Sequence, residues 1–181
     1  MATPKYLLEQ ALARFPILLI KDEARQERYL RDALEFYAQH SGALVRTRLE
    51  QPEILISPQP LGFNGCYNKR GDWIITKYDR TTEKLHVLDD PKNSPWDMSY
   101  FVNLRHWDYE TDLPTDLEFT LVIDHIESLL GEANAQQMSL TSFVASLEGM
   151  ERKGMSEYSQ QRLAVEEQIR KQAHLPDFAI L

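Results

Sequence analysis

The hydrophobic positions of residues 113–131 follow a helical pattern with its own start and stop signals. Thr115 and Glu118 have the spacing of a capping box, in which each side chain accepts a hydrogen bond from the backbone N–H of the other residue. Gly131 predicts the end of the helix, because glycine readily takes the left-handed conformation found there. Apolar residues cover most of the circumference in between, which is typical of a helix buried on more than one side.

This helix is predicted to be the element around which the rest of the chain packs. It is too short and too charged to cross a bilayer, so protein must cover it. One small chain has little surface with which to cover a helix that is apolar nearly all round, and we therefore expect neighbouring copies to share the covering. The residues predicted to pack between subunits are Leu117, Leu121, Val122, Ile126, Leu129 and Leu130.

Two amphipathic segments near the N-terminus predict a pair of antiparallel helices. Thr3 and Pro4 are a cap and a first-turn proline, and apolar residues at helical spacing follow to about Arg14. Asp22 is predicted to cap the second helix, whose apolar stripe continues to residues 41–42.

The middle of the chain changes to a strand pattern, with β-branched and aromatic residues in short runs between turn-forming residues. The predicted strands span residues 43–49, 53–57, 73–78, 84–88 and 100–106. Residues 73–78 and 84–88 predict a hairpin in which Trp73 and Ile75 share one face and Ile74 lies on the other. Residues 58–67 contain two prolines and two glycines and predict a loop.

The C-terminal part predicts further helix and then an apolar tail. Pro176 ends the helix, yet apolar residues follow it, which is unusual for a disordered terminus. An arm that docks on a partner or sister subunit and a tail that folds over its own core both fit this pattern. The residues of the predicted portal-docking arm are His174, Leu175, Pro176, Asp177, Phe178, Ala179, Ile180 and Leu181.

Together these patterns predict an α+β chain that is mainly helical. We expect a small helical bundle with a short antiparallel β-sheet insertion and an extended C-terminal arm. Residues 1–138 form the helical core with strands at about 43–106, and residues 139–181 form the C-terminal helix and the apolar arm. A chain of 181 residues with 43% hydrophobic residues can form one such core.

Composition narrows the functional classes. A formal net charge of −8 argues against binding nucleic acid by neutralising phosphates. The lone cysteine, Cys66, excludes an internal disulfide and fits a reducing cytosol, and no secretory signal begins the chain. Acidic residues outnumber basic ones between residues 79 and 118, which fits solvated loops, a cation site or a surface that repels a polyanion.

Motifs for catalysis or cofactor binding are absent from the sequence, so we expect neither an enzyme nor a cofactor. Nothing around Cys66 marks an activated thiol. His106, Asp108 and Glu110 alternate and could hold a divalent cation on one side of an extended strand, although polar residues at a strand end explain them as well.

Two further polar features have simple structural interpretations. His125 is expected to be a histidine whose hydrogen bonds are satisfied within the fold. Lys69 and Arg70, close to Trp73, could touch a phosphate, but two basic residues do not make a groove, and a solvated turn is the expected structure.

The order of elements resembles the head-to-tail connector adaptors of tailed bacteriophages, including the group called tail tubular protein A or gatekeeper in short-tailed phages. That order is two helices, a strand-rich insertion, a buried helix introduced by an acidic and proline-containing segment, a further helix and an apolar tail. The resemblance is carried by residues 22–42, by 78–81 in the hairpin, and by 104–130 with Arg105, residues 108–109 and residues 113–114.

The resemblance implies a structural virion protein without catalysis. Such an adaptor forms a homo-oligomeric ring, usually of twelve subunits, between the portal protein and the tail or nozzle protein. Packaged DNA passes through it without sequence-specific binding, and no membrane is involved. The location implied is the neck of the virion, between capsid and tail, after synthesis in the host cytoplasm.

The sequence is also consistent with two other functions. One is a small acidic binding or immunity-type module that neutralises a protein partner through Asp89, Asp90 and Asp97. The more remote one is a metal-dependent hydrolase that uses His106 with nearby carboxylates.

Overall fold

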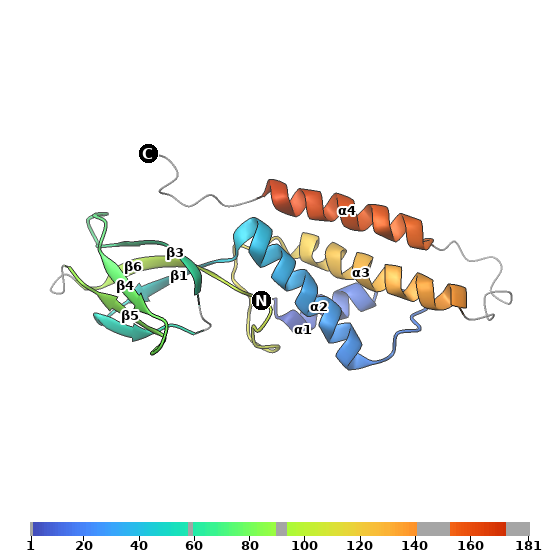
Figure 1. Ribbon diagram of the computed structural model, residues 1–181, viewed down its shortest axis with the longest axis horizontal. Helices are drawn as coiled ribbons and strands as arrows, with labels where there is room; N and C mark the ends of the chain where they lie inside the picture. The colour runs from blue at the N-terminus through green and yellow to red at the C-terminus, as the bar shows by residue number, and fades with distance from the viewer. Residues whose placement is uncertain (1, 58–59, 90–93, 141–152, 173–181) are drawn as a thin grey trace.

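The computed structural model of the protein describes residues 2–57, 60–89, 94–140 and 153–172. These residues form a mixed α+β fold, as predicted, with four α-helices and two small antiparallel sheets where one sheet was expected. Helices make up 44% of the chain, and "mainly helical" is not confirmed. Figure 1 shows the strands gathered at one end of the molecule and the helices at the other. The predicted arm and the apolar residues Phe143, Val144 and Leu147 lie outside the described residues.

The elements follow one another in a simple order, with the strands inserted between the second and third helices (Figure 1). The helices are α1 (Pro4–Leu12), α2 (Glu23–Tyr37), α3 (Phe119–Leu140) and α4 (Met155–Lys171), and a π-helical turn, η1 (Ala38–Gly42), extends α2. The strands are β1 (Leu44–Leu49), β2 (Glu53–Leu55), β3 (Pro60–Tyr67), β4 (Thr76–Asp79), β5 (Lys84–Val87) and β6 (Trp96–Val102).

The first two helices begin where the sequence predicts. The Thr3 hydroxyl accepts a hydrogen bond from the Tyr6 N–H at 3.2 Å, and the Asp22 carboxylate accepts one from the Ala24 N–H at 3.0 Å. Both bonds satisfy a backbone donor that has no partner within its own helix. The two predicted caps are therefore confirmed.

Helix α3 differs from its prediction at both ends. Its start does not use Thr115, since the Glu118 N–H donates to the Tyr37 hydroxyl at 3.0 Å and the helix begins at Phe119. Its end is not Gly131 either, because the helix continues to Leu140. A Cβ atom at Gly131 would lie 2.2 Å from the Tyr158 ring, so this glycine makes room for the approach of α4.

The residues predicted to pack α3 against other subunits lie inside the molecule. Helices α1, α2 and α4 of the same chain pack on α3 and cover its apolar surface. Leu129 is partly buried, and the buried members of the set are Leu117, Leu121, Val122, Ile126 and Leu130. The premise that sister copies must cover this helix is therefore wrong. The predicted domain boundary after residue 138 also falls within α3, and α4 belongs to the same bundle.

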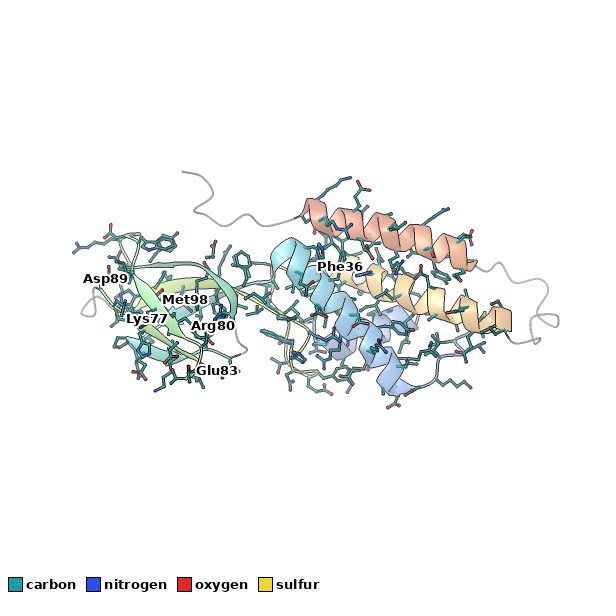
Figure 2. The ribbon with its side chains drawn as sticks, in the orientation of Figure 1. Phe36, Lys77, Arg80, Glu83, Asp89 and Met98 are labelled. Atoms are coloured by element: carbon teal, nitrogen blue, oxygen red, sulfur yellow. The ribbon has the colours of Figure 1, made fainter. Side chains whose placement is uncertain are left out.

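The strands form a separate lobe, which we call the β lobe. One sheet has the order β1-β6-β3 and the other β2-β5-β4, and all pairs are antiparallel. The predicted hairpin is confirmed as β4 and β5, although β4 begins at Thr76 and not at residue 73. The last strand is placed earlier than predicted, because β6 ends at Val102. Its alternate residues Trp96, Met98, Tyr100 and Val102 point into the lobe (Met98 is labelled in Figure 2).

The prediction of a loop at residues 58–67 is wrong from Pro60 onwards. Residues 60–67 form β3, which pairs with β6 through two irregularities in register, at Pro60/Gly62 and at Phe63/Gly65. Such bulges let a strand with proline and glycine remain in a sheet at its edge. The Tyr67 ring packs over Gly65, where an added Cβ atom would lie 2.6 Å from the outer end of the ring.

A group of ion pairs fixes the segment after β6 to α2. The Arg105 guanidinium contacts Asp32 at 3.1 Å and also pairs with Glu35. The Arg31 guanidinium donates to the Trp107 carbonyl and pairs with a carboxylate one turn away on the same helix. These contacts hold the chain where it leaves the β lobe against the helical bundle.

Candidate interaction surface

The end of the β lobe furthest from the helices exposes three large apolar side chains, which we call the lobe tip: Trp73, Ile75 and Leu88. They are 52%, 56% and 58% exposed, respectively. The Leu88 N–H donates to the Ile75 carbonyl at 2.9 Å, so these two residues are neighbours across the hairpin. Trp73 lies two residues before Ile75 and shares its side of the extended chain, and its ring packs edge-on against Tyr67 with centroids 5.4 Å apart.

Local hydrogen bonds hold the lobe tip in place. The Asp89 carboxylate accepts a hydrogen bond from the Ile75 N–H at 2.6 Å, and Figure 2 shows Asp89 at the far end of the lobe. The Asn68 side chain accepts from the N–H groups of Arg70 and Asp72 and closes the turn between Tyr67 and the tip. The three apolar side chains therefore stand on an ordered backbone and form a surface suited to contact with protein.

The outer face of the β1-β6-β3 sheet carries a second, more polar depression. It is an open groove of about 450 Å³ lined by Arg46, Thr47, Arg48, Tyr67, Asp97, Met98 and Ser99. Arg46 lies 3.8 Å from Asp116, and Arg48 lies 3.9 Å from Glu50. Carboxylates therefore balance the two arginines, and this groove is a poor match for a phosphate-rich ligand.

Two of the three acidic residues proposed for a binding module, Asp89 and Asp97, lie in the described part of the chain. The Asp89 carboxylate holds the backbone of the lobe tip, and Asp97 lies on the outer face of the sheet opposite Arg48. Asp90 lies outside the described residues.

The residues considered for a metal site do not share a strand. Residues 105–110 form turns, so the expectation of one extended strand here is wrong. Asp108 accepts hydrogen bonds from the Glu110 N–H and the Thr111 hydroxyl, while the Glu110 carboxylate pairs with Lys5 at 2.9 Å. Across the described ranges no group of three or more histidine, cysteine, aspartate or glutamate side chains is arranged to hold a metal ion.

Cys66 is buried on β3, inside the β lobe. Burial, together with the nearby carboxylates of Asp89 and Asp97, raises the pKa of the Cys66 thiol to about 11. Little thiolate is therefore present at neutral pH, which is the opposite of the environment that activates a cysteine nucleophile.

We expect iodoacetamide to alkylate Cys66 in the folded protein at pH 7.5 at least about a hundredfold more slowly than an exposed thiol, because the pKa is about 11 instead of near 9. Mass spectrometry over time measures this rate. A Leu55→Cys variant supplies a thiol at a position that is 61% exposed, for comparison in the same molecule. Equal rates at the two positions contradict the buried, protonated state.

His125 is buried between α2, α3 and α4, with an exposed fraction of 2%. Neither ring nitrogen has a hydrogen-bond partner among the described residues, so the expectation of a satisfied histidine is wrong. The nearest acidic oxygen belongs to Glu166, 3.6 Å from Nε2, and Arg162 and Arg170 lie against the same carboxylate. Burial, with smaller contributions from Arg162 and then His40, lowers the pKa of His125 to about 4.

Aromatic contacts enclose this histidine from the side of α2. Phe36, labelled in Figure 2, meets the His125 ring edge-on with centroids 4.9 Å apart, and the guanidinium of Arg170 lies over the Phe36 ring. His125 is thus a neutral, apolar-packed ring at the α3–α4 contact and not a group open to substrate.

No protein-family model and no curated protein matches the chain. Among the helices described, none is long and apolar enough to span a bilayer. Three of the exposed large apolar side chains in the described part of the chain gather at the lobe tip.

Proposed function

We propose that the protein is a structural subunit of a head-to-tail adaptor, which assembles as a ring of copies between a portal protein and a tail. The observation that carries this proposal is the lobe tip, where Trp73, Ile75 and Leu88 are each more than half exposed on an ordered hairpin. Exposed apolar side chains that gather on one surface mark contacts with other proteins. The order of elements that resembles the adaptors supports the same function.

In this proposal the lobe tip, and not α3, forms the contacts between copies. Because α3 is covered by its own chain, contacts between copies must use other surfaces. Asp89, which is hydrogen-bonded to Ile75 of the tip, lies at the end of the lobe away from the helical bundle (Figure 2). A patch that packs against a different surface of the next copy gives a ring when the rotation closes. The net charge of −8, repeated around such a ring, keeps DNA from adhering to the channel wall.

In this proposal the C-terminal residues 174–181 contact the portal protein, and the assembled ring lies in the neck of the virion. An apolar segment gains contact area when it inserts into a partner, at the cost of the entropy of ordering it. The subunit itself carries out no reaction.

The proposal predicts that Ile75→Asp abolishes the ring, because a charge at the centre of an apolar contact must lose its water. The mass of the assembly, measured by sedimentation velocity, falls to that of one subunit. Negative-stain images of the wild-type protein, alone and with a portal protein, show whether the larger species is a ring.

Leu55→Asp is the matched control, since Leu55 is 61% exposed on β2 and lies outside the lobe tip. It leaves the mass of the assembly unchanged. A wild-type protein that stays monomeric both alone and with a portal protein contradicts the proposed function.

A further inference from the structure

A shallow groove lies where the helical bundle meets the β lobe, and we call it the junction groove. It measures about 360 Å³, at the lower end of the range of roughly 300 to 1,000 Å³ found for small-ligand pockets. Its lining comes from η1, β3 and β6: Ala38, Gln39, His40, Ser41, Gly42, Leu61, Gly62 and Phe101. Aspartate, glutamate, lysine and arginine are absent from this lining, although they make up 27% of the chain.

The floor of the junction groove offers open apolar surface. Leu61 is 52% exposed, and Phe101 lies on the outward face of β6, directly paired with Gly62. A Cβ atom added at Gly62 would meet nothing within 4 Å. The space above this residue is therefore free to receive apolar side chains.

Helix α4 brings the C-terminal residues to the edge of this groove. The Gln172 carbonyl accepts a hydrogen bond from the Ser41 hydroxyl at 3.3 Å, and the Gln172 side chain donates to Glu118 at 2.7 Å. Ser41 is itself a lining residue of the groove. An extended chain advances about 3.3 Å per residue, so Leu175 lies within about 10 Å of Gln172.

We propose that residues 173–181 of the same chain dock in the junction groove. Four of these residues are large and apolar, namely Leu175, Phe178, Ile180 and Leu181, and they match an uncharged groove that begins where α4 ends. Docking within one chain is favoured because the tether keeps the segment at a high effective concentration. The role of this docking rests on the proposed function. In an adaptor subunit, the docked arm does not contact other copies before the portal protein binds it.

Cross-linking of the full chain tests this placement. Gly62→Cys and Ala179→Cys place one thiol in the groove and one in the arm while keeping every large apolar residue, and Cys66 does not compete because it is buried. A flexible bis-maleimide tolerates different positions of the arm along the groove. We expect a rapid cross-link within one chain at low protein concentration, seen by mass spectrometry of the intact protein.

Leu61→Ser in this background removes apolar contact without changing the reach of the chain. It slows the intramolecular cross-link at least about tenfold, which corresponds to about 1.4 kcal/mol of docking free energy. Leu55→Ser removes an equally exposed leucine on β2 and leaves the rate unchanged. Equal rates in the two serine variants, or a product that joins two chains, overturn the proposal.

The result of the cross-linking experiment does not depend on whether the protein assembles into a ring. Cross-linking reports on one dilute chain, whereas the mass of the assembly reports on contacts at the lobe tip. A protein that cross-links as expected but never assembles disproves the adaptor function and leaves the docked arm in place. A protein that assembles but shows no effect of Leu61→Ser disproves the docked arm alone.

Discussion

Acidification from pH 6.5 to pH 4 is expected to lower the free energy of unfolding by about 3 kcal/mol through His125 alone. The folded protein holds this ring neutral with a pKa of about 4, whereas the same side chain in the unfolded chain has its ordinary value of 6.5. Between these two values the unfolded state binds the proton and the folded state does not. Stability is therefore fully present above pH 6.5 and falls as the pH decreases towards 4.

Urea unfolding at pH 7.0 and pH 4.5 measures this effect, with His125→Phe as the variant that removes the titration while keeping a ring beside Phe36. The variant is expected to lose much less stability on acidification than the wild type. His106→Phe, at an exposed turn, is the control and keeps the wild-type dependence. The same loss in His125→Phe as in the wild type shows that other groups cause it.

Gly131→Ala is expected to destabilise the protein by about 2 kcal/mol, although the same change in an ordinary helix interior stabilises by about 1 kcal/mol. The added methyl group would lie 2.2 Å from the Tyr158 ring, close to the point where that ring joins its side chain. Either the ring or α4 must therefore move. This movement weakens the packing between α3 and α4. Thermal unfolding followed by circular dichroism measures the resulting loss of stability.

A second substitution shows whether the Tyr158 ring is the cause. In a Tyr158→Ala background the methyl group has room, and Gly131→Ala is expected to become neutral or stabilising. Gly62→Ala serves as the control for adding a methyl group, because nothing lies within 4 Å of its Cβ position, and it changes stability by less than about 0.5 kcal/mol. A Gly131→Ala protein as stable as the wild type contradicts the close packing of the two helices.

The helices and the hairpin could be predicted because their signals are local. The caps at Thr3 and Asp22 and the alternation around Ile75 depend on residues a few positions apart. The strand at residues 60–67 could not, since its prolines and glycines indicate a loop and only pairing with β6 makes it a strand. Gly131 was misinterpreted for the same reason: its role depends on Tyr158, which lies on another helix.

The candidate surface was predictable only in part. Alternation assigned Trp73 and Ile75 to one face, but the sequence does not show which face is covered, because exposed and buried apolar residues have the same pattern. Leu88 joins them through the hairpin register. The burial of α3 was misjudged because the sequence gives no measure of how much surface α1, α2 and α4 together supply.

The β lobe leaves and rejoins the helical part at a single point. The Val102 N–H donates to the Ala43 carbonyl at 3.0 Å, so the two ends of the inserted segment are held side by side. A few glycines can bridge that gap, so the course of the backbone permits an inserted segment of a different size at this point. Because the two ends of the insertion lie side by side, a different β segment can replace this one in evolution. Such a replacement changes the contacts that the protein makes while its helices stay the same.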